Sequence, residues 1–450
     1  MAADTKDMTT GNPARLLLAF SMPLMFGNLF QQFYTFADAL IVGQCVSASA
    51  LAALGAAEWL TFIMFGVIQG ITQGASVVIA RFFGEKQTDA LQRAIYGGCC
   101  ISAAGAVVFM MAGRAALAPM LHILRTPEEI LDLTQTYLRI LYAGVPVTFL
   151  YNMAAAVLRA LGNSRKPLHA MILASIGNVL LDVLFVAQFD MGIAGAAYGT
   201  VLAQLLAALY CVAAIRKIDV CRIKQENRTA DENILREQVK MGVPMAVQNI
   251  ITALGGLVVQ ATVNGFGIVF LTGYAAANKV YVLLEIAATS YGHGILTYTA
   301  QNRGTGSRRI WDGLMASLVI GTATALMMSG IMVFAGQQVL GLFIRETEAG
   351  AAQMIGVGYG YLRVLAIGFP LLYCLYVVRS CIQGLGDSVF PMLSSFMQVI
   401  MRVSCALFLT RLIGSSGVFF GEVAAWTGAD LFLACVCVWR LRGIRMQDRL

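Results

Sequence analysis

Residues 137–146 read YLRILYAGVP, and residues 361–370 read YLRVLAIGFP. The two stretches lie 224 residues apart, and the same offset relates LGNSRKP at 161–167 to LGDSVFP at 385–391. A shared offset in two separate motifs indicates that one structural design occurs twice in the chain.

The composition is that of an integral membrane protein. Of the 450 residues, 58% are hydrophobic and only 12% are charged, and the mean hydropathy is +0.74. A helix that crosses a hydrocarbon layer of about 30 Å needs roughly 20 apolar residues. The runs are continuous and lack the alternation of an outer-membrane barrel, so we expect an all-α polytopic protein. The sequence predicts twelve transmembrane helices, over 14–44, 50–80, 93–116, 132–158, 167–189, 192–215, 239–266, 271–300, 311–335, 354–384, 390–411 and 415–440.

The repeat divides these helices into two lobes of six. We expect an N-terminal lobe over 1–215, a cytoplasmic linker over 216–238 and a C-terminal lobe over 239–450. Because six is an even number, the two lobes share one topology and are related by an axis along the membrane normal, as in secondary transporters. The repeat therefore favours a transporter over a channel or a receptor.

Basic residues gather in the loops after even-numbered spans, among them Arg81, Arg159, Arg216, Arg303 and Arg440. The positive-inside rule then places both termini in the cytoplasm, in a multi-pass protein of the plasma membrane, which we expect to be the bacterial inner membrane. This asymmetry accounts for the net charge of +7, so no nucleic-acid partner is needed. We expect a monomer.

The motifs of common catalytic sites are absent. The sequence has no P-loop lysine, HExxH or GxSxG motif, and its ten cysteines lack zinc-type spacing. We therefore expect neither an enzyme nor a bound cofactor.

Ionisable residues inside a span are costly and usually functional or paired. Asp182 lies about 22 Å along its outward-running span, and Asp38 is similarly late in the first span. Tyr137 and Thr200 lie near the outer starts of inward-running spans, and Asn178 shares a helix face with Asp182. One lobe can thus gather these five residues at one level.

Two carboxylates in a poorly solvated pocket cannot both stay ionised alone. Either one of them holds a proton, or a cation sits between them. Oxygen ligands from Asp38, Asn178, Asp182 and Thr200 suit a hard cation such as Na⁺. The alternative is that both carboxylates are hydrated near the outer interface or have a structural role.

The second lobe does not repeat this chemistry. Under the repeat, Arg402 takes the place of Asn178, Ala406 replaces Asp182, and Glu422 stands where the first lobe has Thr200. We expect an ion pair of Arg402 with Glu422, which keeps this lobe closed and leaves it without a pair of titrating acids.

Two further residues inside spans are candidates for a role. Pro23 removes a backbone hydrogen bond from the first helix, so this helix can bend there. Glu285 has no evident partner except Lys279, six residues earlier. It is a candidate contact for a cationic substrate, and a satisfied structural role is the alternative.

Several longer stretches resemble the multidrug and toxic compound extrusion (MATE) family. They are SMPLMFGNLFQQFYTFADALIVGQ, QGASVVIARFFGEKQ, RALGNSRKP, GNVLLDVLF and TAQNRGTG, and the resemblance covers nearly the whole chain. The acidic pattern is similar to that of the bacterial branch with the DNA-damage-inducible (DinF-like) transporters. The resemblance implies a coupling-ion site of Asp38, Tyr137, Asn178, Asp182 and Thr200.

The resemblance also implies export of bulky, often cationic and aromatic drugs by alternating access, coupled to H⁺ or Na⁺. The main alternative is a flippase of lipid-linked oligosaccharides from the same wider superfamily. Such a flippase should need a cationic cavity for pyrophosphate, whereas the strongest predicted site is acidic.

Overall fold

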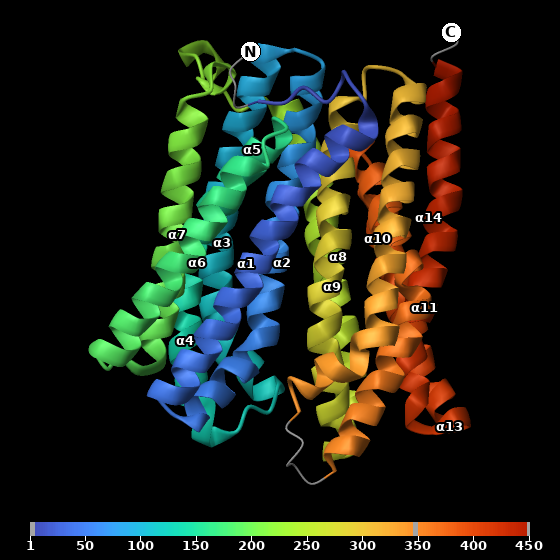
Figure 1. Cartoon of the computed structure of the whole chain (residues 1–450). Helices are drawn as coiled ribbons and strands as arrows, with labels where there is room; N and C mark the ends of the chain where they lie inside the picture. The colour runs from blue at the N-terminus through green and yellow to red at the C-terminus, as the bar shows by residue number, and fades with distance from the viewer. Residues whose placement is uncertain (1–4, 345–349, 448–450) are drawn as a thin grey trace. The chain divides into compact units, whose positions relative to one another are not determined.

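The computed structural model describes residues 5–344 and 350–447, and within these ranges the chain forms helices and no β-strand (Figure 1). The prediction of an all-α fold is thereby confirmed. The α-helices are α1 Pro13–Cys45, α2 Ala48–Gly84, α3 Thr88–Ile123, α4 Glu128–Ala143, α5 Val145–Ala160, α6 Arg165–Asp182, α7 Gly192–Arg216, α8 Glu232–Asn264, α9 Ile268–Gln301, α10 Ser307–Gly341, α11 Ala351–Gly384, α12 Val389–Ser404, α13 Thr410–Ile413 and α14 Phe420–Gln447.

Every predicted span falls on one of these helices or on a closely joined pair. In the part of the chain that the structure describes, ten helices are long and apolar enough to cross a membrane, and α4 with α5 forms an eleventh span bent by 50°. One of the ten is the 55-residue stretch Val389–Gly443. Straight, it would measure about 80 Å, far more than a hydrocarbon layer of about 30 Å. It folds back at Gly414, where φ is +73°, and α12 packs against α14, so it supplies two passes.

The repeated LG(N/D)S motif builds the same turn in both halves. Gly162 has a φ of +77° and Gly386 a φ of +88°, a conformation that glycine adopts without steric cost. The next residue then accepts hydrogen bonds on its side-chain Oδ1 from the backbone N–H groups two and three residues later. These distances are 3.1 and 3.0 Å at Asn163, and 3.1 and 3.4 Å at Asp387. The repeat is therefore structural as well as sequential.

The chain forms two compact units. Unit 1 contains residues 1–7 and 22–246, and unit 2 contains residues 8–21 and 247–450. Two helices are shared: α1 passes from unit 2 into unit 1 next to Pro23, and α8 passes from unit 1 into unit 2 next to Pro244. The unit bounds differ from the repeat bounds because the first helix of each repeat begins in the other unit.

Glycines let each exchanged helix half pack closely within its unit. In unit 1 a methyl group added to Gly70 of α2 would overlap the backbone of Ala246 on α8. In unit 2 a methyl group added to Gly294 of α9 would overlap Ser21 Oγ on α1. Gly294 follows Gly70 by the repeat offset, so both exchanged halves are held in the same way.

The segment between α7 and α8 is an ordered part of unit 1. Two short 3₁₀-helices, Asp219–Cys221 and Gln225–Asn227, lead into α8. Asn227 is 1% exposed, and its Nδ2 donates to Asp89 Oδ1 at 2.9 Å and to Gln92 Oε1 at 3.0 Å. These bonds hold the segment against the start of α3.

Candidate functional site

Unit 1 buries all five residues predicted for its ion site. Asp182 is 0% exposed and Asn178 is 1% exposed, while Asp38, Tyr137 and Thr200 are each 8% exposed. They come from α1, α4, α6 and α7, so only the tertiary packing of unit 1 brings them together. Asn178 contacts Asp182, and Asn178 and Thr200 line one cavity, whereas the role of the five residues stays a prediction.

The two carboxyl groups approach each other closely. The side chains of Asp38 and Asp182 are within hydrogen-bonding contact, and Asn178 Nδ2 donates to Asp182 Oδ1 at 3.5 Å. A deprotonated carboxylate only accepts hydrogen bonds, so a contact between two of them requires a proton on one or a cation shared by both.

Three oxygen atoms at this place are buried without a hydrogen-bond partner. They are Oδ1 of Asp38, Oδ1 of Asn178 and Oδ2 of Asp182. Buried polar atoms in folded proteins are nearly always satisfied, so these acceptors are suited to a proton, a water molecule or a hard cation. Among the described residues no group of three His, Cys, Asp or Glu side chains could hold a metal ion. The donor set is two carboxylates with amide and hydroxyl oxygens, which fits a small hard cation.

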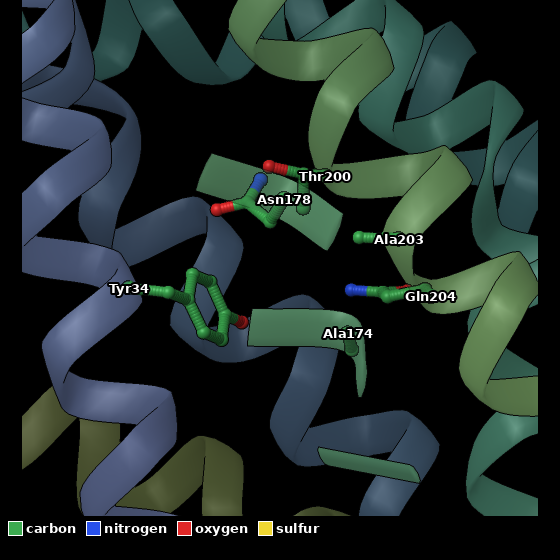
Figure 2. A pocket seen from close by; sticks show the side chains of 6 residues that line it. All are labelled: Tyr34, Ala174, Asn178, Thr200, Ala203 and Gln204. Atoms are coloured by element: carbon green, nitrogen blue, oxygen red, sulfur yellow. The ribbon is translucent and has the colours of Figure 1, made fainter. Parts of the chain in front are cut away.

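A small cavity lies next to Asn178, the hydrogen-bond partner of Asp182. Figure 2 shows Asn178 and Thr200 next to each other at one side of it, with the ring of Tyr34 facing them. Its volume of about 10 Å³ is close to the lower limit for one water molecule. The cavity can therefore take a water molecule or a small ion but no drug. Its lining is Tyr34, Ala174, Asn178, Thr200, Ala203 and Gln204.

Tyr34 and Gln204 are members of the site that sequence reasoning missed. Each lies one helical turn from a residue that was found, because Tyr34 precedes Asp38 by four and Gln204 follows Thr200 by four. Gln204 also accepts a hydrogen bond on Oε1 from Thr148 Oγ1 at 2.6 Å, which ties α7 to α5. Helical spacing from Asp38 and Thr200 was a signal that could have identified both.

The backbone adapts to Asp182 on two sides. On α7, a methyl group added to Gly199 would overlap Asp182 Oδ1, so only a glycine allows the carboxyl group to lie there. Directly after Asp182 the helix widens into a π-helical segment, Val183–Gln188. Such segments are rare and often occur at functional sites. Unit 2 has a π-helical segment near the corresponding place, Cys405–Leu409, which contains Ala406.

Unit 2 holds the charged pair expected for it. Arg402 Nη2 lies 2.7 Å from Glu422 Oε2, and the two side chains are 9% and 13% exposed. This distance is that of a charge-assisted hydrogen bond. Whether the pair keeps the unit closed stays a prediction.

Glu285 has a partner that the sequence did not indicate. Tyr376 Oη, from α11, donates to Glu285 Oε1 at 2.9 Å. A cationic substrate would have to compete with this bond, and the substrate contact stays a prediction.

Unit 2 buries polar atoms of two more charged residues that the sequence did not single out. Arg379 of α11 is 7% exposed, and its Nε and Nη2 have no hydrogen-bond partner. Both carboxylate oxygens of Asp430 on α14 are likewise buried without one. Both residues lie inside predicted spans, so a complete list of ionisable residues in the spans would have found them.

The comparisons with known proteins agree with the fold. The MatE family model matches residues 23–184 and 244–408. The probable multidrug resistance protein YpnP of Bacillus subtilis (strain 168) is 26% identical over 419 residues, which cover 92% of each chain. The multidrug export protein MepA of Staphylococcus aureus (strain MRSA252) is 24% identical over 424 residues, which cover 91% of this chain and 90% of MepA.

Solved structures have the same fold at lower identity. A crystal structure described as MATE in the bent conformation has a TM-score of 0.91 at 19% identity and covers 100% of both chains. A transporter of the MOP superfamily from Pyrococcus furiosus has a TM-score of 0.91 at 19% identity and covers 98% of both chains. The description of that structure speaks of a reversed polarity of its binding pocket.

Proposed function

Because the chain belongs to the MatE family of multidrug efflux transporters, we propose that an inward flow of H⁺ or Na⁺ drives its export of bulky, often cationic and aromatic compounds. The protein is a multi-pass membrane protein that carries small molecules. The proposal concerns the coupling ion, its binding site and the kind of compound.

The observation that carries the proposal is the pair of buried carboxyl groups at Asp38 and Asp182. Their contact requires a bound proton or a cation, and the adjoining cavity of about 10 Å³ admits nothing larger than a water molecule or an ion. A site of this size and charge is suited to a coupling ion. Asn178, Thr200 and Tyr137 complete it, the first two as oxygen ligands if the ion is Na⁺.

Coupling follows from the charge of this site. When the protein is open to the outside, the drug leaves and H⁺ or Na⁺ binds at the carboxylates. A ligand shifts a conformational equilibrium only by its difference in affinity for the two states. Drug and ion must therefore prefer different states, and the loss of negative charge at the carboxylates is the signal for the change.

Helix α1 is the element that can transmit this change. It carries Asp38 in unit 1, and it passes into unit 2 beside Pro23, where the proline cannot donate the regular helical hydrogen bond. We propose that binding of the coupling ion bends α1 at Pro23. At the positions that the repeat matches to the unit 1 site, unit 2 has the Arg402–Glu422 pair and no two carboxyl groups. Unit 1 therefore carries the coupling ion in this proposal.

The remaining assignments rest on the sequence. The distribution of basic residues supports cytoplasmic termini and the plasma membrane as the location. We propose a monomer that needs no nucleic acid and no cofactor besides the transported ion.

Drug resistance of cells that express carboxylate variants tests the proposal. Asp38→Asn and Asp182→Asn should each abolish resistance at unchanged expression, because neither amide can release a proton or neutralise a cation. The matched control is Asp190→Asn in the exposed turn before α7, where φ is +51° and asparagine fits equally well. Full resistance in both buried-site variants would refute the assignment.

A further inference from the structure

A second and larger hollow lies on unit 1 and is lined by neither Asp38 nor Asp182. This groove has a volume of about 370 Å³, which is in the range of small-molecule sites. It is formed by α3, α4, α5 and α7, and the residues that matter for its chemistry are Arg114, Arg139, Gly144, Val147, Tyr198 and Val201. We call it the arginine groove.

The groove lies at the bend between α4 and α5. The two helices meet at 50° around Gly144 and Pro146, and Pro146 cannot donate a backbone hydrogen bond. A methyl group on Gly144 would lie 2.5 Å from Val201 Cγ2, so α7 packs directly on the bend. The repeat counterpart of this span, α11, is one continuous helix with Pro370 inside it. The bend therefore belongs to unit 1.

Two arginines from different helices converge on the groove. Arg114 of α3 and Arg139 of α4 are both exposed, and neither forms an ion pair with a carboxylate of the described chain. Arg139 Nη2 donates to Gln135 Oε1 at 2.9 Å, which leaves its charge uncompensated. Two positive charges that line one groove without an acid are stabilised when an anion binds between them.

The groove lies in the outer half of unit 1, within the predicted spans 93–116, 132–158 and 192–215. Arg114 is nine residues, or about 14 Å, from the end of α3, and Tyr198 is six residues, or about 9 Å, from the start of α7. Both helix ends are on the side that the basic residues predict to face outward. Charged side chains inside the spans are costly unless they are paired, and a lipid phosphate is a partner available there.

Apolar side chains beside the groove face outward from the helices. Met111 precedes Arg114 by three residues and is 64% exposed, and Leu202 follows Tyr198 by four and is 38% exposed. These spacings put each on the face of its groove neighbour. In a membrane protein such side chains meet acyl chains, so the groove opens toward lipid.

We propose that the arginine groove binds an anionic glycerophospholipid. Its phosphate lies between the guanidinium groups of Arg114 and Arg139, and an acyl chain follows the apolar side formed by Val147 and Val201. A free anion would use the arginines and leave the apolar side unused, whereas a zwitterionic lipid would bring a cation toward two arginines. An anionic phospholipid can contact both the two arginines and the apolar side of the groove.

Lipid retention by the purified full-length protein tests this site. Native mass spectrometry measures binding of phosphatidylglycerol and of phosphatidylcholine to the wild type and to Arg114→Gln, Arg139→Gln and the double variant. The wild type should retain phosphatidylglycerol in preference, each single variant should retain less, and the double variant should lose the preference. Val147→Trp, which fills the groove but keeps both arginines, should also lose the preference for phosphatidylglycerol.

The repeat provides a matched control. Arg363 is the counterpart of Arg139 in unit 2, is exposed, lies over the ring of Tyr359 and does not line this groove. Arg363→Gln removes the same charge and should keep the preference. Equal retention of both lipids by the wild type, or an unchanged preference in the double variant, would overturn the proposal. Displacement of the lipid by glycerophosphate at equal concentration would also overturn it, because the site would then recognise the free anion.

Discussion

Gly199 of α7 lies directly against the carboxyl group of Asp182 at the end of α6, so closely that a methyl group at position 199 would overlap Oδ1. The position of this carboxyl group therefore depends on the absence of a side chain at position 199 of the neighbouring helix. Gly199→Ala should displace Asp182 from Asp38 and reduce drug export to the level of Asp182→Asn. Transport by purified protein in vesicles measures the effect.

The control for this substitution is Gly177→Ala on α6, where the added methyl group would meet only Leu206 Cδ1 at 3.4 Å. That variant should transport like the wild type. Wild-type transport by Gly199→Ala would show that the exact place of Asp182 does not matter.

The pair of Arg402 and Glu422 predicts a non-additive effect on stability. Removing one partner of a buried pair typically costs about 3–5 kcal/mol, because the other charge stays buried alone, while replacing both is often close to neutral. Arg402→Met and Glu422→Leu should each lower the midpoint of thermal unfolding in detergent, and the double variant should recover much of the loss. Neutralising the exposed pair of Arg222 and Asp219, whose side chains are 68% and 80% exposed, should change little. Additive losses in the double variant would contradict a coupled pair.

The segment before α8 contains a thiol, that of Cys221, which should react slowly with alkylating reagents. Cys221 is 7% exposed, and burial raises its pKa to about 12. Because the thiolate is the reactive form, alkylation of Cys221 should be much slower than that of the exposed Cys45 at pH 8. Below the pKa the thiolate fraction rises about tenfold for each pH unit, so the rate should rise in the same way between pH 7 and pH 10. Mass spectrometry of the labelled peptides measures both rates.

The same thiol reports on the anchor at Asn227. Loss of its buried hydrogen bonds should cost about 1–3 kcal/mol of local stability, so Asn227→Ala should speed labelling of Cys221 by roughly tenfold. Asn233→Ala removes an exposed asparagine six residues later and serves as the control. An unchanged rate in Asn227→Ala would mean that these bonds do not hold the segment closed.

Pro23→Ala tests the bend in α1. Alanine restores an N–H that can donate to the carbonyl of Ala19, which favours the straight helix. We expect slower transport with equal or higher thermal stability, and we expect Pro119→Ala, inside α3, to leave transport unchanged. Transport at the wild-type rate by Pro23→Ala would argue against bending at this residue.

The repeat made the fold largely predictable, but not the positions at which a helix breaks. The shared LG(N/D)S motif foreshadowed the equal turns at Gly162 and Gly386. The shared G-x-P motif, in contrast, gives a 50° break at Gly144 and a continuous helix through Pro370, so local sequence alone does not decide it. The close neighbour does not decide it either, because Gly144 packs against Val201 of α7 and its counterpart Gly368 packs against Val423 of α14.

For the site, the sequence predicts how deep each side chain lies in the membrane but not toward which neighbouring helix it points. Counting residues along each span put Asp38, Tyr137, Asn178, Asp182 and Thr200 at one level. Which helix faces point toward one another depends on tertiary packing, and this is why Tyr34 and Gln204 were missed although they lie one turn from Asp38 and Thr200. The π-helical segment after Asp182 also has no local signal in the sequence.

The most direct test of the central claim is drug transport in vesicles with the H⁺ and Na⁺ gradients imposed separately. One of the two gradients should drive transport by the wild type, and neither should drive it in Asp38→Asn or Asp182→Asn, while both variants remain folded and inserted. Gradient-driven transport at the wild-type rate in either variant would contradict the claim that these two carboxyl groups bind the coupling ion.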